Sequence, residues 1–307
     1  MISLDGGGIR GILTARLLHR IDEHFPILKA DMFAGTSTGG ILAIGLAAGY
    51  SPEALVEFYH IEGPKIFRRS FLRKLSAQIR RAKYGNENLK IALDAYFKDL
   101  TVNDLEKKIL IPTFDLDDGS QVRRSWKAKF FHNFQDNHPD NKEFLRDIAL
   151  ATSSAPIFFP THRNYVDGGV VANNPSMAAL AQLLASNYQI YNTSMLSIGT
   201  GKNPKFIGAN HDWGLFQWSS FVTDIVMDGD VDVARYQAEQ VMRDHYHRLN
   251  PILDEDIPLD DTGSIPYLIE IADKTDLVPT FEWLEKNWPK HDQLRVRQPD
   301  ETPRGVS

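Results

Sequence analysis

Residues 2–11 of the chain, ISLDGGGIRG, decide the fold class. Residues 2–4 have the apolar character of the end of a buried strand, and four glycines follow between Gly6 and Gly11. From Ile12 onward, apolar residues recur at the spacing of a helix. A glycine loop between a strand and a helix can bring backbone N–H groups close to an anion, and it is typical of an α/β protein. The loop therefore poses a functional question, because the anion could be a nucleotide phosphate or an oxyanion formed during a reaction.

The rest of the chain continues this alternation of strands and helices. Further strands are expected at residues 32–34, 108–116, 122–131, 164–166 and 195–198, and further helices at 41–48, 144–151, 177–186 and 221–249. The pattern predicts a three-layer α/β/α domain with a mostly parallel central sheet over residues 1–290, followed by a polar, flexible tail at 291–307. Four glycine-marked loops, at residues 5–11, 35–40, 167–169 and 199–201, are expected at the carboxyl ends of strands, where such sheets place their functional groups.

Composition excludes several classes of protein. The 307 residues carry a net charge of −6 and contain no cysteine, which excludes a disulfide framework and a thiolate metal site. The acidic balance also makes a broad nucleic-acid-binding surface unexpected. The longest apolar run, residues 39–49, is shorter than the roughly 20 residues of a membrane-spanning helix. Since no signal peptide precedes the first motif, we expect a cytoplasmic protein.

A candidate nucleophile lies in the second glycine loop. The sequence GTSTG, from Gly35 to Gly39, matches the G-x-S-x-G pattern between a short strand and a buried helix. In that context the serine, Ser37, occupies a strained turn, and the small residues around it let strand and helix approach closely. A glycine-rich helix cap is the alternative for this motif.

Asp167 is the better candidate for the base that activates Ser37. None of the ten histidines lies in a glycine-marked loop. The usual order in hydrolases of this class would nominate His211, His245, His247 or His291, which can equally be surface or capping residues. Asp167 ends a short strand and precedes Gly168 and Gly169, which leave space around it, and burial would raise its pKa. A simple Asp-Gly turn is the alternative.

The first glycine loop admits two functions. Gly6, Gly8 and Gly11 have the G-x-G-x-x-G spacing of a dinucleotide site, with Asp31 near the distance expected for the acidic residue. However, Asp31 precedes a strand instead of ending one. The oxyanion interpretation is favoured, because consecutive glycine amides can point at a tetrahedral intermediate without obstruction. Arg10 could add charge beside a substrate phosphate or face solvent.

Together, DGGGIRG, GTSTG and the DGG of Asp167 to Gly169 closely resemble the patatin-like phospholipase family. The resemblance extends to SSAPIFFP before Asp167, to NNP at Asn173 to Pro175, and more loosely to GPKIF at Gly63 to Phe67 and LSIGTG at Leu196 to Gly201. It covers roughly residues 1 to 270. Almost nothing precedes the first strand, so any extra N-terminal element of relatives is expected to be missing here.

The resemblance implies a serine lipid acyl hydrolase without cofactor, metal or catalytic histidine. Ser37 would be the nucleophile, Asp167 the proton acceptor, and the amides of Gly6, Gly7 and Gly8 the oxyanion hole. The substrate would be a glycerolipid or phospholipid, cleaved through an acyl-enzyme. The alternatives are an esterase for non-membrane esters, a hydrolase that needs an activating ligand, and a non-catalytic nucleotide- or ligand-binding α/β protein.

One basic segment could bring the protein to its lipid. The stretch from Lys65 to Lys83, KIFRRSFLRKLSAQIRRAK, has eight basic residues and no acidic one, with apolar residues at mostly helical spacing. A basic amphipathic helix can lie on an anionic membrane surface, so peripheral membrane contact is one expectation. Packing of its apolar side on the core is the other. The sequence contains no signal for an oligomeric state.

Overall fold

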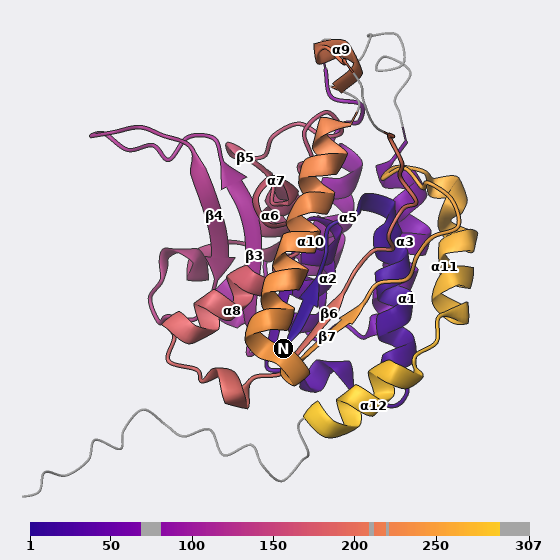
Figure 1. Cartoon of the computed structure of the whole chain (residues 1–307). Helices are drawn as coiled ribbons and strands as arrows, with labels where there is room; N and C mark the ends of the chain where they lie inside the picture. Colours follow the sequence, from indigo (N-terminus) through magenta and orange to yellow (C-terminus); the bar gives the residue numbers. More distant parts are fainter. Residues whose placement is uncertain (69–80, 209–211, 219–220, 289–307) are drawn as a thin grey trace, which may run out of the picture.

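A mixed, mostly parallel sheet with helices on both faces forms the centre of the molecule (Figure 1). The computed structural model describes residues 1–68, 81–208, 212–218 and 221–288. The sheet has seven strands in the order β4-β3-β2-β1-β6-β7, with β5 paired to β3 outside this path. The strands are β1 (Ile2–Leu4), β2 (Met32–Gly35), β3 (Lys108–Asp115), β4 (Lys127–His132), β5 (Tyr165–Asp167), β6 (Met195–Ile198) and β7 (Tyr246–Leu249).

Helices cover both faces of this sheet. They are α1 (Gly11–Asp22), α2 (Thr38–Ala47), α3 (Pro52–Ile66), α5 (Glu87–Phe97), α6 (Leu145–Thr152), α7 (Gly169–Ala172), α8 (Ser176–Ala185), α9 (Leu215–Trp218), α10 (Val222–Met242), α11 (Ile265–Lys274) and α12 (Val278–Asn287). Successive strand residues point to opposite faces. In β2, for example, Phe33 joins the large core cluster that includes α1, α2 and α3, whereas Met32 and Ala34 pack with α8. The predicted three-layer α/β/α class is confirmed.

The helix after the serine motif is buried throughout. All ten residues of α2 are buried, because the helix lies between the sheet and its neighbours. Burying an apolar side chain of the size of Leu or Ile contributes about 1.5–3 kcal/mol. The helix can therefore hold the turn before it in a fixed position.

The short strand β5 ends at Asp167, and its direction in the sheet was not expected from the sequence. We expected loop 167–169 at the carboxyl end of a parallel strand, but β5 runs antiparallel to β3, with Asp167 opposite Thr113. Strand β3 pairs with β4 along one edge. Along its other edge, β3 pairs first with β2, up to Leu110, and then with β5, from Thr113 onward. Strands β2 and β5 thus lie end to end along β3, and Asp167 faces the turn that follows β2.

Two other sequence predictions about elements are wrong. The helix expected over residues 221–249 ends at Met242, and Tyr246–Leu249 form strand β7, parallel to β6. Arg243, with a φ of 49°, turns the chain between them. Strand β4 begins at Lys127 instead of residue 122, and the side chain of Val122 is 97% exposed.

Two predicted segments lie partly or wholly outside the described residues. These are the tail at 291–307 and residues 69–80 of the basic stretch. At the described start of that stretch, Phe67 packs against Tyr84 and Phe159, as the core-packing alternative expects. Among the described helices, none is both long and apolar enough to cross a bilayer.

Candidate active site

Ser37 occupies the sharp turn between β2 and α2. Its backbone has φ 55° and ψ −122°, a conformation that is costly for a residue with a Cβ. The turn closes because its glycines leave no side chain in the way. A Cβ on Gly35 would overlap the carbonyl of Gly39, and a Cβ on Gly39 would overlap the carbonyl of Leu4 in β1. This strand–turn–helix geometry is the context that a G-x-S-x-G nucleophile requires.

Thr152 at the end of α6 supports the turn from behind. Its hydroxyl accepts a 3.0 Å hydrogen bond from the Ser37 N–H and donates a 2.7 Å hydrogen bond to the carbonyl of Pro112. All three groups are buried, so the strained backbone at Ser37 has a fixed partner. The sequence gives no signal for this role of Thr152, because it depends on how α6 packs beside β3.

Asp167 lies within hydrogen-bond distance of the serine hydroxyl. Ser37 Oγ donates to Asp167 Oδ2 at 2.5 Å, and the other carboxylate oxygen accepts the Gly169 N–H at 2.7 Å. Burial raises the pKa of Asp167 to about 7, against the opposing effect of the hydrogen bonds from Ser37 and Gly169. A carboxylate with such a pKa is far more basic than an exposed one and can accept a proton at neutral pH.

The glycine loop lies beside this pair, and its N–H groups differ in their partners. Gly6 donates its N–H to the carbonyl of Asn173 at 3.0 Å, so this donor is already used. Gly7 and Gly8 line the cavity together with Ser37 and Asp167. Within the described part of the chain, no partner is found for the N–H of Gly7 or of Gly8.

The same loop has close protein neighbours at both of these glycines. A Cβ on Gly7 would overlap Thr200, and a Cβ on Gly8, which has φ 58°, would overlap the carbonyl of Leu259. That carbonyl also accepts the Ile9 N–H at 2.8 Å. The loop therefore packs closely against Thr200 and Leu259, and Leu259 also lines the cavity.

Arg10 lies behind the loop and is not brought to the cavity. Its guanidinium donates to the carbonyls of Gly7 and Gly201, each at 3.4 Å, and it is absent from the described lining of the cavity. Burial lowers the pKa of Arg10, and the carboxylates of Asp228 and Asp256 oppose this shift. The geometry fits a residue that holds two loops together, whereas the sequence suggested substrate contact or solvent exposure.

A buried ion pair holds the start of the glycine loop. Arg248 on β7 donates to Asp5 Oδ1 at 2.9 Å and also contacts Oδ2, and it donates to Ser197 Oγ at 2.8 Å. Asp5 is 2% exposed, and its burial raises its pKa against the attraction of Arg248. Next to this pair, Asn250 accepts the Gly201 N–H at 2.9 Å. Sequence reasoning missed Arg248, because residues 221–249 were read as a helix, and it assigned no role to Asn250, which follows them.

Ser37 and Asp167 line a mostly apolar cavity. The cavity has a volume of about 280 Å³. Its apolar walls come from α3, α5, the segment before β5, α7 and α10, and they include Phe58, Ile66, Leu89, Phe158, Val170 and Met227. A hydrophobic chain with a polar reacting group at one end would match this distribution.

No histidine is found in the described lining of this cavity. His245 hydrogen-bonds Ser194, and His247 on β7 stacks on Trp283 and hydrogen-bonds Thr280. Two other candidates, His211 and His291, lie outside the described residues. The group that contacts Ser37 in the described site is Asp167.

Comparison with known proteins shows to which family this chain belongs. The model of the patatin-like phospholipase family matches residues 2–180, more than half of the chain. The chain is 29% identical to "Protein teg" of Priestia megaterium and 29% identical to the "Putative sporulation hydrolase CotR" of Bacillus subtilis, each over 94% of this chain and 98% of the relative. It is 30% identical to a "cGAMP-activated phospholipase" of Pseudomonas aeruginosa over 81% of this chain and 77% of that protein. The chain therefore belongs to the patatin-like phospholipase family, a family of lipid acyl hydrolases.

Proposed function

We propose that the chain hydrolyses fatty acyl esters of glycerolipids through a dyad of Ser37 and Asp167. The observation that carries the proposal is the 2.5 Å hydrogen bond between Ser37 Oγ and Asp167 Oδ2 in the lining of a mostly apolar cavity. The family membership supports the reaction class. The acyl chain of the substrate would lie along the apolar walls, with its ester carbonyl carbon beside Ser37 Oγ.

In the first step, Asp167 accepts the proton of Ser37 as the serine oxygen attacks the ester carbonyl. The carbonyl oxygen becomes an oxyanion, and the N–H groups of Gly7 and Gly8 would stabilise it. Gly6 contributes to the loop's position instead, because its N–H donates to Asn173. Collapse of the intermediate returns the proton to the leaving alcohol, which is a lysolipid when the substrate is a phospholipid. Water, deprotonated by Asp167, then hydrolyses the acyl-enzyme.

The surface around the cavity mouth supports contact with a lipid layer. Ile157 is 64% exposed and lies between Pro156 and Phe158, which both line the cavity. On the other side, Val170 is 39% exposed, and Val226, next to the lining residue Met227, is 54% exposed. Exposed apolar side chains at a cavity entrance can enter a lipid surface, so we extend the proposed peripheral contact from the basic stretch between Lys65 and Lys83 to this rim.

The dyad is tested by labelling with a fluorophosphonate, combined with fatty acid release from mixed phospholipid vesicles. Wild type should be labelled at Ser37 and release fatty acid, whereas Ser37→Ala should show neither. Ser153 is a second serine in the cavity lining and serves as the matched control. Ser153→Ala should still be labelled at Ser37. Labelling at Ser153, or an unlabelled but folded wild type, would contradict the proposal.

The lipid-surface contact separates a phospholipase from an esterase for soluble esters. Ile157→Asp should reduce hydrolysis of vesicles while leaving hydrolysis of a short soluble ester nearly unchanged. Val122→Asp is the control, because Val122 is also apolar and is more exposed than Ile157, but it lies in the β3–β4 connection and is not among the residues that line the cavity. Equal effects of Ile157→Asp on both substrates would favour the esterase alternative.

A further inference from the structure

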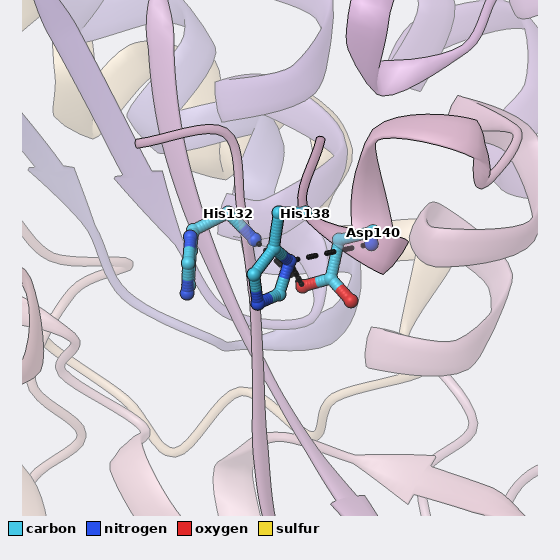
Figure 2. A group of neighbouring side chains, drawn as sticks. All are labelled: His132, His138 and Asp140. Carbon is cyan, nitrogen blue, oxygen red and sulfur yellow. Dashed lines mark hydrogen bonds and ion pairs between the residues drawn. The ribbon is translucent and has the colours of Figure 1, made fainter. Parts of the chain in front are cut away.

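We propose that His132, His138 and Asp140 form a binding site for a divalent transition-metal ion such as Zn²⁺, separate from the active site. His132 ends strand β4, His138 precedes a short 3-10 helix (Pro139–Lys142), and Asp140 lies within it. Each residue offers one ligand atom, and these atoms all lie within 4.8 Å of one another. Figure 2 shows the ring of His138 between His132 and the carboxylate of Asp140.

The two imidazoles lie close together without a hydrogen bond between them. Their ring centroids are 4.5 Å apart, and Nδ1 of His132 is buried with no hydrogen-bond partner among the described residues. A buried ring nitrogen without a partner is unfavourable, and a metal ion would satisfy it.

The backbone around the three residues is fixed before any ion binds. The side chain of Asn133, which follows His132, accepts the Ile109 N–H and donates to the Lys107 carbonyl, each at 2.9 Å. Asp140 Oδ2 accepts the His132 N–H at 3.2 Å, and His138 Nδ1 accepts the Asp140 N–H at 3.3 Å. Both ends of the loop between the histidines are thus held in place.

Small side-chain movements would complete the site. Ligand atoms around a tetrahedral Zn²⁺ lie roughly 3.3 Å apart, since each bond is about 2.0–2.1 Å long. Rotation of the two half-buried rings would bring the present ligand atoms to that spacing. Imidazole and carboxylate ligands without thiolate suit Zn²⁺ and its neighbours in the first transition row, and three protein ligands leave a position for water.

Lys129 is the group that competes with the ion. Its ammonium pairs with Asp140 Oδ1 at 2.5 Å, while the other carboxylate oxygen faces the histidines. Removal of this cation should therefore strengthen metal binding, because the carboxylate would lose its present counter-charge. Substitution of Lys129 is thus expected to increase the affinity for the ion, whereas substitution of either histidine is expected to decrease it.

The site has no part in the hydrolysis proposed above. None of its residues lines the cavity, and β4 pairs with the edge of β3 opposite to that shared by β2 and β5. An ion there would fasten the loop after the edge strand to the sheet. The expectation that the reaction itself uses no metal is independent of this site.

The test measures Zn²⁺ binding to the full, untagged chain by titration calorimetry, with Co²⁺ absorption as a second readout. Wild type should bind one Zn²⁺ per chain at pH 7.5. His132→Gln and His138→Gln should each weaken binding roughly tenfold or more, and Lys129→Met should strengthen it. The matched control is His162→Gln, because His162 contacts Asp147 at 2.9 Å with similar burial and is no member of the cluster.

Circular dichroism and thermal unfolding without metal identify any variant that fails to fold. A folded wild type that binds no Zn²⁺ overturns the proposal. So does binding that His162→Gln reduces as much as His132→Gln and His138→Gln do. If Lys129→Met leaves the affinity unchanged, Asp140 is not a ligand and the three-residue site is wrong.

Discussion

The turn at residues 35–39 presents a side chain to the cavity, whereas the loop at Gly6 to Gly8 presents its backbone. In the turn, glycines are needed because neighbouring backbone atoms lie where a Cβ would be. The result is a strained backbone at Ser37, the proposed nucleophile, which lines the cavity. In the loop, the glycines keep two N–H groups uncovered while the opposite side packs on Thr200 and Leu259. Glycine therefore makes room for the proposed nucleophile in the turn, whereas in the loop its own N–H groups are the proposed donors to the oxyanion.

The largest expected loss of activity is at Asp167, the proposed base for Ser37. Asp167→Asn keeps the shape of the site but cannot accept the serine proton, so kcat should fall by about 10⁴-fold. The measurement is steady-state hydrolysis of a soluble ester at pH 8. A decrease of less than about tenfold in a folded variant would mean that another group accepts the proton.

Stability provides the control for this variant. Burial raises the pKa of Asp167 to about 7, so the folded state keeps a proton that the unfolded state loses near pH 4. Wild-type stability from this group is present at low pH and decreases as pH rises between those values. Asp167→Asn lacks this decrease, and at pH 8 it should unfold at the same temperature as wild type or higher.

The next effect concerns the support of the glycine loop. Arg248→Met leaves the buried carboxylate of Asp5 without its partner, which should cost about 3–5 kcal/mol of unfolding free energy. Urea unfolding measures this loss. The double variant Asp5→Asn with Arg248→Met should recover part of it, because no charge then remains buried. A single variant as stable as wild type would show that the pair does not hold the loop.

A smaller effect is expected from the loop itself. Gly7→Ala places a methyl group against Thr200 and displaces the N–H groups, so the acylation rate should fall by about 10²–10³-fold. Single-turnover measurement of acyl-enzyme formation isolates this step.

The contrasting substitution in the turn is Gly39→Ala. Its methyl group meets the backbone of Leu4 and Asp5, which cannot move aside, so stability should fall by about 1–3 kcal/mol. Gly7→Ala should affect the rate more than the stability, and Gly39→Ala should affect both. The distinction between the two loops is wrong if both variants behave alike.

Ser37, Asp167 and the glycines near them could be proposed as site residues from the sequence because their motifs are local. Glycines around Ser37 and after Asp167 indicate that the backbone is crowded within a few positions of each residue. This local signal can be read from a single sequence. The supporting residues could not be predicted in this way. Arg248 meets Asp5 across the sheet from a strand of four residues, in a segment whose apolar residues also fit a helix. The antiparallel direction of β5 and the pairing of Gly6 with Asn173 arise only when distant segments assemble.

The pH dependence of acylation gives the smallest expected difference between the turn at residues 35–39 and the loop at Gly6 to Gly8. Amide N–H groups do not titrate, whereas the base at Ser37 does, so acylation should depend on pH through Asp167. Because the carboxylate is the active form, kcat/KM should rise about tenfold per pH unit and level off above about pH 7. Gly7→Ala should lower the plateau of this curve and keep its midpoint. A wild-type midpoint near pH 4 would mean that Asp167 ionises like an exposed carboxylate. A midpoint that moves in Gly7→Ala would mean that the loop influences the pKa of Asp167 as well as holding the oxyanion.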